Sequence, residues 1–282
     1  IPLDTETEGL FFFHFELEQN GCLTFLSPDG ITDRFAGEWQ LLVCNDRYPS
    51  EYGFSGGAIY HIFVDRFAKG GDYPPRSDAI MLDWEKDTPE YAEKPGDFLR
   101  KNTFFGGTLT GIADKLDYIS SLGVDLIYLS PVFTAYSNHK YDTGDYMSVD
   151  PMFGGDEALK TLIDGCHKRS IRIILDGVFN HVGDDSIYFD SGNKYGGALH
   201  NPSSPYREWF NISPDGGYEC WWGVKNLPKV IKCDSFRSYI CDTVIPKYMK
   251  MGIDGWRLDV VDEYPESFLE RITSASKSID RN

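Results

Sequence analysis

Four short runs of mostly apolar residues, separated by segments with helical periodicity, constrain the fold of this chain more than any other feature. The runs span residues 58–64, 124–129, 171–178 and 253–259. Strands that are apolar on both faces need cover on both faces, and helices that alternate with such strands are typical of a parallel sheet. The choice lies between an open doubly wound sheet and a (β/α)8 barrel. No glycine-rich phosphate motif follows any run, which removes the best support for a nucleotide-binding open sheet.

The segments between these runs carry the apolar spacing of amphipathic helices. We expect helices over residues 111–122, 156–169, 235–251 and 265–278. Pro246 lies within the third of these segments and predicts a kink or a break there, because proline lacks the N–H that an intact helix needs.

The first 52 residues show the alternating pattern of antiparallel strands instead. Phe11, Phe13 and Phe15 alternate with Phe12 and His14, turn signals follow at residues 20–21 and 27–30, and residues 39–43 form a third strand. About three strands are few for an independent domain. We therefore interpret residues 1–52 as the C-terminal part of an N-terminal β-sandwich module.

Two long segments without a strand or helix pattern interrupt the alternating part of the chain. Residues 68–103 are polar and predict an elaborated loop, whereas residues 180–232 are rich in glycine, proline and aromatic residues and predict a protruding subdomain. We expect residues 53–179 to form the first part of a barrel. Residues 233–282 continue that barrel through a fourth strand and the following helix.

The composition excludes several classes of function. The chain has 27 Lys and Arg against 44 Asp and Glu, a formal charge of −17, which argues against a nucleic-acid binder. No apolar run approaches the ~18 residues of a membrane helix, so we expect no membrane partner. The six cysteines show no CxxC pair and no zinc-ligand spacing. We expect free, mostly buried thiols in a cytoplasmic protein, with a secreted form that has lost its leader as the alternative.

Ionisable residues stand at the ends of two of the strands. Because side chains alternate along a strand, Arg257 and Asp259 share one face, as do Asp176 and Asn180, and His181 begins the next loop. Opposite charges on one face indicate either a structural ion pair or part of a site. At the C-terminal end of a barrel strand the second interpretation is favoured, because active sites of α/β barrels lie there.

These motifs resemble signature regions of the α-amylase superfamily, glycoside hydrolase family 13. The stretches that carry the resemblance are residues 59–67, 124–131, 139–146, 176–181, 226–229 and 255–259. They are most similar to the neopullulanase, cyclomaltodextrinase and maltogenic amylase branch, and the resemblance covers roughly residues 10–272. It implies a (β/α)8 TIM barrel, of which this chain holds strands 1–4.

The resemblance also implies a function, the retaining hydrolysis of α-glucosidic bonds in maltooligosaccharides, cyclodextrins or pullulan. Asp259 matches the nucleophile that forms a covalent glycosyl-enzyme, and Arg257 matches the residue that keeps that carboxylate ionised. The positions that match substrate-binding or supporting residues are His181, Tyr141, Asp142, Asp176 and Glu263. The expected partner is an α-glucan oligosaccharide, and a homodimer stays open.

Two departures from the family pattern bear on cofactors and specificity. The calcium-binding loop of this branch usually carries Asn-Gly-Asp and a later Gly-Gly-Asp, but residues 69–72 read Lys-Gly-Gly-Asp and residues 106–108 read Gly-Gly-Thr. Losing oxygen ligands weakens a site for a hard cation, so we expect no calcium, no other metal and no cofactor. Residues 260–263 and 227–231 also depart from the pattern, which leaves the exact substrate open.

The general acid is the part of the mechanism that the sequence does not supply. A retaining glycosidase needs a second carboxyl group ~5–5.5 Å from the nucleophile. Glu263 lies four residues after Asp259, ~13 Å away if the strand continues, and the family takes its acid from a fifth strand. We therefore predict that the chain alone is nearly inactive on α-glucans. The alternative is a non-catalytic α-glucan-binding or assembly protein built on a half barrel.

Aromatic residues in the protruding segment allow two interpretations. Their rings either stack on sugars or form the core of the subdomain. The residues concerned are Trp209, Tyr218, Trp221 and Trp222.

Overall fold

The computed structural model describes residues 7, 9–43, 56–94 and 99–280. Its internal contacts divide the chain into two units, residues 1–55 and 56–282, and each is described by itself. The boundary expected between residues 52 and 53 lies outside the described residues, as does Cys44.

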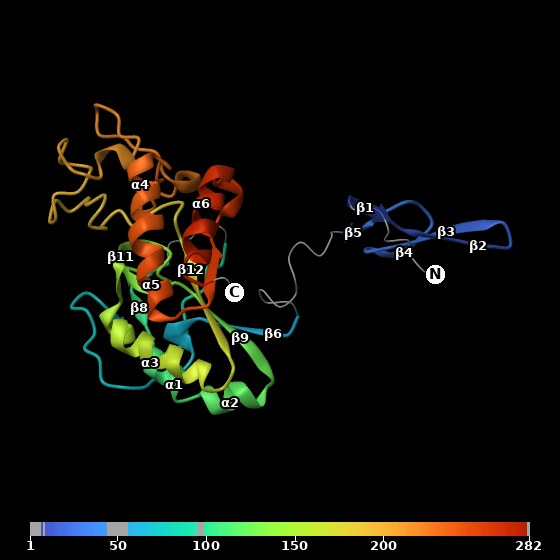
Figure 1. Cartoon of the computed structure of the whole chain (residues 1–282), viewed down its shortest axis with the longest axis horizontal. Coiled ribbons are helices and arrows are strands. Elements are labelled where there is room, and N and C mark those ends of the chain that lie inside the picture. The colour runs from blue at the N-terminus through green and yellow to red at the C-terminus, as the bar shows by residue number, and fades with distance from the viewer. Residues whose placement is uncertain (1–6, 8, 44–55, 95–98, 281–282) are drawn as a thin grey trace. The chain divides into compact units, whose positions relative to one another are not determined.

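The first unit consists of antiparallel strands (Figure 1). They are β1 (Gly9–Phe13), β2 (Phe15–Gln19), β3 (Cys22–Ser27), β4 (Gly30–Thr32) and β5 (Trp39–Val43). β1 pairs with β5, while β2, β3 and β4 form a separate sheet. The turn between β2 and β3 has positive φ at both Asn20 and Gly21, as a two-residue hairpin of this kind requires. The predicted hairpins are confirmed, but the strand expected over residues 11–15 is broken at His14.

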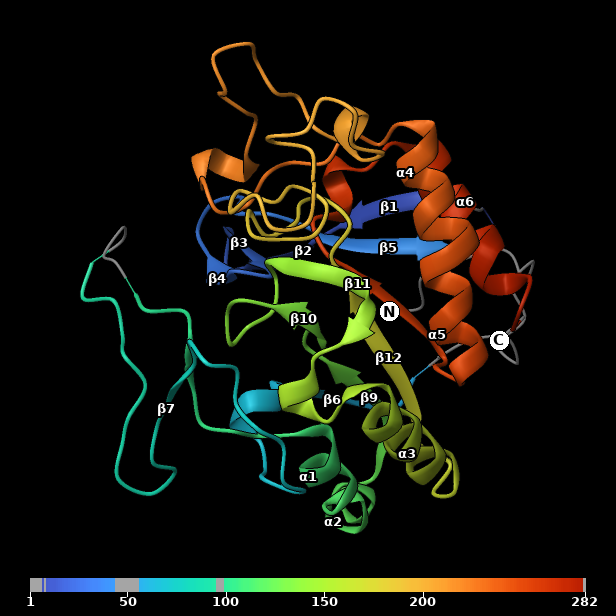
Figure 2. The ribbon, with the colours of Figure 1, turned by 90° about the vertical axis from the view of Figure 1, so that its left-hand side faces the viewer.

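The second unit is built on four parallel strands (Figure 2). They are β6 (Ala58–Ile62), β9 (Val124–Leu129), β12 (Arg172–Gly177) and β13 (Gly255–Leu258). Their order in the sheet is β13-β12-β9-β6, so the four strands follow one another across the sheet in the order in which they occur in the chain. A doubly wound sheet would reverse this order at a switch point. These four strands show no such reversal, which agrees with the order in a barrel.

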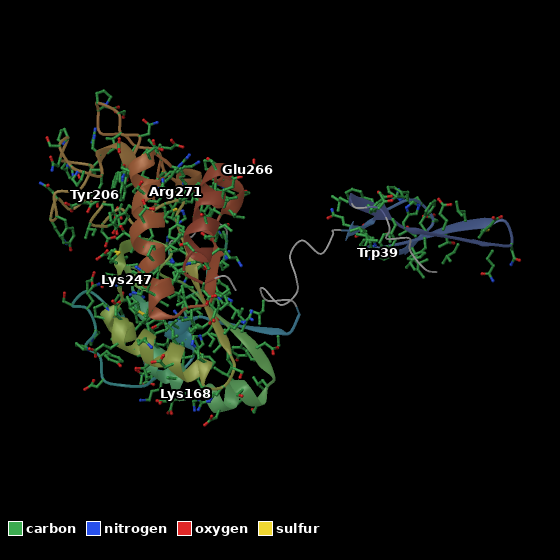
Figure 3. All side chains as sticks on the ribbon, viewed as in Figure 1. Trp39, Lys168, Tyr206, Lys247, Glu266 and Arg271 are labelled. Carbon is green, nitrogen blue, oxygen red and sulfur yellow. The ribbon has the colours of Figure 1, made fainter. Side chains whose placement is uncertain are left out.

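Helices cover one face of this sheet, as Figure 2 shows. They are α1 (Leu109–Ala113), α2 (Leu116–Ser121), α3 (Gly155–His167), α4 (Asp234–Tyr239), a π-helical turn (Ile240–Val244), α5 (Ile245–Met251) and α6 (Glu266–Lys277). Strand side chains that point toward them, such as Ile127, Leu129, Ile173 and Leu175, are buried in a continuous apolar core. Ion pairs at the helix surfaces add to this packing, and Lys247, labelled in Figure 3, lies 2.7 Å from a carboxylate oxygen of Asp156.

Short elements complete the second unit. Two hairpin strands, β10 (Phe133–Ala135) and β11 (Thr143–Val149), pair with each other, as do β7 (Ile80–Met81) and β8 (Thr103–Phe104). The 3-10 helices are Val64–Arg66, Pro151–Phe153, Arg207–Trp209, Trp221–Gly223 and Val261–Glu263. Residues 180–232 contain only two of these turns and isolated bridges, and their buried core is largely aromatic.

The structure differs from the prediction most clearly in three segments. The first strand ends at Ile62, two residues early, because a 3-10 turn follows in which the carboxylate of Asp65 accepts hydrogen bonds from the backbone N–H groups of Phe105 and Gly106. The helix expected over residues 111–122 is two helices that break near Lys115, which still buries the apolar residues that gave the periodicity.

The third difference concerns Pro246. The π-helical turn over Ile240–Val244 widens the backbone directly before this proline, and α5 continues through it. A wide turn accommodates the missing N–H of proline, so the segment is neither sharply broken nor a regular α-helix.

Two predictions about burial are wrong. The strands are not all covered on both faces, because Ile59 on β6 is 56% exposed. Of the five described cysteines only Cys166 and Cys241 are buried, and Cys22 on β3 is exposed. Within the described residues, no helix combines the length and the apolar character that a membrane crossing needs.

Candidate active site

The register of two neighbouring strands brings three charged side chains together. β12 and β13 are parallel, and Asp176 lies directly opposite Arg257. Nη1 of Arg257 donates to Oδ1 and Oδ2 of Asp176 at 2.9 and 3.1 Å, and to Oδ1 of Asp259 at 2.6 Å. One guanidinium nitrogen therefore joins two carboxylates at the C-terminal ends of adjacent strands, where a barrel places its chemistry.

Asp176 is the fixed end of this cluster. Its side chain is completely buried, and its Oδ2 also accepts hydrogen bonds from the hydroxyls of Tyr128 at 2.5 Å and Tyr141 at 3.0 Å. Burial raises the pKa of the Asp176 carboxyl, while the hydrogen bonds from Tyr128 and Arg257 oppose the rise. Burial would lower the pKa of Arg257, but the bonds to Asp176 and then to Asp259 outweigh it and raise that pKa. Arg257 is thus a permanent cation held in one place.

Asp259 is the accessible carboxylate of the cluster. Its side chain is 15% exposed, whereas that of Asp176 is fully covered. The backbone N–H of Asp259 donates to the carbonyl of Gly177 at 3.2 Å, which continues the strand pairing to this residue. A nucleophilic carboxylate needs a partner that holds it in position and an open side toward the ligand, and Asp259 has both.

His181 lies beside the cluster with unused hydrogen-bonding capacity. Its side chain is almost fully buried, yet within the described part of the chain neither ring nitrogen has a hydrogen-bond partner. Burial lowers the pKa of this imidazole to about 4. The neutral ring has one N–H donor and one acceptor. Buried polar groups are normally paired, so His181 is suited to the hydroxyl groups of a ligand.

Buried hydrogen bonds and an ion pair hold the loop that carries Tyr141 and Asp142. Asp142 is buried and accepts hydrogen bonds from the backbone N–H and the hydroxyl of Ser137. Lys140, which directly precedes Tyr141, is completely buried and has a left-handed φ of 62°. Its Nζ lies 2.5 Å from Oδ2 of Asp150. Asp142 also lines an adjacent cavity of about 940 Å³.

Glu263 reaches the protruding segment instead of continuing a strand. Val260 has a left-handed φ of 51° and the next three residues form a 3-10 turn, so the straight-strand distance used above does not apply. The carboxylate accepts from Asn180 Nδ2 at 3.1 Å and from Trp221 Nε1 at 3.2 Å, and it pairs with Lys229 at 2.9 Å. Although burial opposes it, the bonds from Lys229 and Asn180 lower the pKa of Glu263. A residue held ionised is poorly suited to be a general acid.

Two residues that the sequence pattern did not single out take part in the site. Tyr128 on β9 donates to Asp176, and its place on the inward face of that strand was the available signal. Lys232 donates to Asn180 Oδ1 and to the carbonyl of Val230, both at 2.8 Å, and burial lowers its pKa to about 7. A single lysine at this place in the sequence gave no signal that it would belong to the site.

The aromatic residues of the protruding segment separate into two groups. Trp209 is buried and packs against Tyr188 and Phe236, so it belongs to the core. Trp221 is half-buried and stacks on His181, with ring centroids 5.1 Å apart and planes at 24°. Trp222 is exposed. Tyr218 is half-buried and packs against Phe189. Of the four residues, only Trp221 and Trp222 therefore remain candidates for contact with a ligand at the site.

Two oxygens of the loop in which the family resemblance would place a calcium site are hydrogen-bonded within the chain. The carbonyl of Gly70 accepts a hydrogen bond from the hydroxyl of Thr108 at 2.6 Å, and that hydroxyl accepts from the N–H of Gly111. These oxygens are therefore already engaged. Among the described residues, no group of three or more histidine, cysteine, aspartate or glutamate side chains is arranged to hold a metal ion.

Comparison with known proteins identifies relatives over most of the chain. Residues 61–280 match the family described as alpha amylase, catalytic domain. The amylopullulanase of Thermoanaerobacterium saccharolyticum is 38% identical over 286 residues, which cover 88% of this chain and 22% of the relative. The intracellular maltogenic amylase of Bacillus subtilis (strain 168) is 39% identical over 222 residues, covering 77% of this chain and 35% of the relative.

A solved structure agrees with these relatives. The cyclic alpha-maltosyl-(1→6)-maltose hydrolase from Arthrobacter globiformis, in complex with cyclic alpha-maltosyl-(1→6)-maltose, superposes with a TM-score of 0.67 at 32% identity, over 79% of this chain and 48% of that one. The chain spans less than half the length of each of these three proteins.

Proposed function

The chain belongs to the alpha-amylase family, and on this basis we propose that the protein hydrolyses α-glucosidic bonds in starch-type saccharides with retention of configuration. Maltooligosaccharides, cyclodextrins and pullulan are the substrate class. The observation that carries the proposal is the single nitrogen of Arg257 that bonds both Asp176 and Asp259. The names of the relatives, an amylopullulanase and a maltogenic amylase among them, support the same chemistry.

The proposed mechanism assigns one role to each side chain of the cluster. An oxygen of Asp259 attacks the anomeric carbon while the bond to the leaving oxygen breaks and that oxygen takes a proton from a general acid. Water then hydrolyses the covalent glycosyl-enzyme and gives its proton back to the same acid/base group. Arg257 holds and orients the carboxylate of Asp259, and Asp176 holds Arg257. The remaining residues contact the substrate or brace those that do, namely His181 and Asp142 through hydrogen bonds to sugar hydroxyls, Tyr141 through ring stacking, and Glu263 on the acceptor side.

We further propose that the general acid is not among the residues of this chain, which then holds strands 1–4 of an eight-stranded barrel. Asp176 is fully buried and Glu263 is held ionised, so neither of these carboxylates suits the role. The partial coverage of the relatives is consistent with this division. Residues 1–52 as part of a β-sandwich, and 180–232 as a subdomain protruding after the third strand, belong to the same proposal.

The proposal also covers the cellular compartment, the metal requirement and the oligomeric state of the protein. We place it in the cytoplasm, which the name of the Bacillus relative supports, and we assign it no metal-dependent step because the loop oxygens at Gly70 and Thr108 are engaged. A homodimer stays a prediction that light scattering tests directly.

A substrate with an activated leaving group tests the proposal in this chain. Fluoride leaves from α-maltosyl fluoride with its electron pair and needs no general acid, so the Asp259 half of the mechanism is measured separately. We expect a rapid first release of fluoride by the wild type and then slow formation of the α-anomer, seen by proton NMR, because the missing acid is also the base of the second step. Binding of maltooligosaccharides without any fluoride release would instead support the alternative, a non-catalytic α-glucan-binding or assembly protein.

A further inference from the structure

Trp222 exposes more of its surface than any other large apolar side chain among the described residues. The exposed fraction is 82%, in a segment whose other tryptophans are buried or half-buried. Large aromatic side chains are normally buried because removing their surface from water is favourable. The contribution of side-chain burial to folding therefore does not explain a tryptophan at this exposed position.

The backbone at this position does not favour a tryptophan either. Trp222 has φ 50° and ψ 28°, the left-handed region that residues with a Cβ avoid and glycine adopts freely. The indole is thus kept at a position where neither packing nor backbone geometry favours it. Unfavourable backbone geometry of this kind concentrates at functional sites.

The indole is nevertheless held in place on one side. It stacks on Trp221 with ring centroids 5.2 Å apart and planes at 24°. Trp221 in turn stacks on His181 at 5.1 Å, and its Nε1 donates to Glu263. His181, Trp221 and Trp222 are therefore linked by two successive stacking contacts, and the ring of Trp222 is open to solvent.

We propose that the open face of Trp222 binds a glucosyl ring of an α-glucan, as a second sugar-binding position outside the cluster at Asp259. This inference rests on the proposed function. The C–H faces of a pyranose ring are flat and slightly positive, and the face of an aromatic ring is negative, so the two stack without any hydrogen bond. The net charge of −17 disfavours the nucleotide bases that an exposed ring also attracts.

The position predicts which substrates gain from it. Two stacked rings separate His181 from the open face of Trp222, so a sugar at His181 and a sugar on Trp222 are not adjacent units. Maltose is too short to contact both positions, whereas maltohexaose is long enough. Trp222 therefore increases the affinity for long chains and leaves that for short ones unchanged.

The test compares Trp222→Gly with the wild type in calorimetric titrations with maltose and with maltohexaose. Glycine suits the left-handed backbone, so the melting temperature should stay unchanged or rise, and a loss of binding is not a loss of fold. We expect maltohexaose to bind about tenfold more weakly to the variant. Trp222→Phe should stay within about threefold of the wild type, and Tyr195→Ala, which removes a 62% exposed ring from the same segment, should have no effect.

Three results would overturn the inference. If the wild type binds maltohexaose and Trp222→Gly binds it equally well, the ring is not a sugar position, although the proposed function stands. If the wild type binds no α-glucan, the proposed function fails and the inference with it. Self-association of the wild type that Trp222→Gly abolishes, with unchanged sugar affinity, would identify a protein interface in place of the sugar position.

Discussion

Nη1 of Arg257 lies 2.6 Å from Oδ1 of Asp259, two residues further along the same strand direction. Side chains two apart in a strand point to the same face, so this contact is built into the local geometry. The contact to Asp176 is different, because it crosses from β13 to β12 and depends on their register. Together they make one cation the link between a buried and an accessible carboxylate.

Arg257→Lys should lower the rate of fluoride release from α-maltosyl fluoride by about 100-fold. Lysine keeps the charge but has a shorter reach and lacks the planar group that serves two carboxylates at once. The rate of the first release of fluoride from that substrate measures the effect. Arg169→Lys is the control, since Arg169 pairs with the exposed Asp117 at the surface. A rate within threefold of the wild type would contradict the assigned role.

Asp259→Asn should abolish fluoride release and leave the affinity for maltohexaose within a few-fold, because the amide keeps the shape and loses the nucleophile. Asp262→Asn, at an exposed carboxylate three residues later, is the matched control and should retain activity. Mass spectrometry of the trapped glycosyl-enzyme should place the sugar on Asp259. Turnover by the variant, or a label on another residue, would remove Asp259 from the mechanism.

The chain should release fluoride from α-maltosyl fluoride in the first step but be nearly inactive on maltohexaose, because the oxygen leaving group of the natural substrate needs a proton from a general acid. The full-length maltogenic amylase of Bacillus subtilis serves as the positive control on both substrates. Comparable activity of the chain on maltohexaose would show that a described carboxyl group, or another group of this chain, supplies the acid.

His181 should make the protein less stable in acid. Its pKa is about 4 in the folded state and ~6.5 in the unfolded state, so the unfolded chain binds the extra proton as the pH falls below ~6.5 and folding becomes less favourable. Between pH 8 and 4.5 this costs about 2–3 kcal/mol. Urea unfolding across this range should show a smaller loss for His181→Gln than for the wild type.

The difference between these two proteins isolates His181. Asp185, whose pKa burial raises to about 6, acts in the opposite direction over the same range but is present in both. Parallel pH profiles for the wild type and His181→Gln would mean that the imidazole is not held neutral in the folded state.

Lys140→Met should destabilise the protein by about 3–5 kcal/mol, because it leaves the buried Asp150 carboxylate without its cation. Adding Asp150→Asn should recover part of that loss, which urea unfolding of both single variants and the double variant measures. The control is Lys160→Met, at a half-exposed pair with Asp164, which should cost at most about 0.5 kcal/mol. Equal costs at the two lysines would argue against a special role for burial.

Local sequence patterns predicted the four parallel strands and most of the helices to within a few residues, because periodicity depends on neighbours in the chain. The same locality explains the errors. The end of the first strand at Ile62 depends on the carboxylate of Asp65, which accepts hydrogen bonds from N–H groups about 40 residues away in the sequence. The break between the two helices near Lys115 depends on how their apolar side chains pack in the core. Neither is visible within a short window of sequence.

The candidate site divides in the same way. The alternation of a strand alone determined that Arg257 and Asp259 share a face, and the spacing of residues 176–181 placed Asp176 before His181. Only the tertiary structure decided that Asp176 faces Arg257, that Glu263 turns back to Trp221, and that Trp209 is buried while Trp222 is exposed. The physical reason is that register, chain reversal and burial depend on contacts between residues far apart in the sequence, whereas the direction of a side chain along one strand depends only on the backbone beside it.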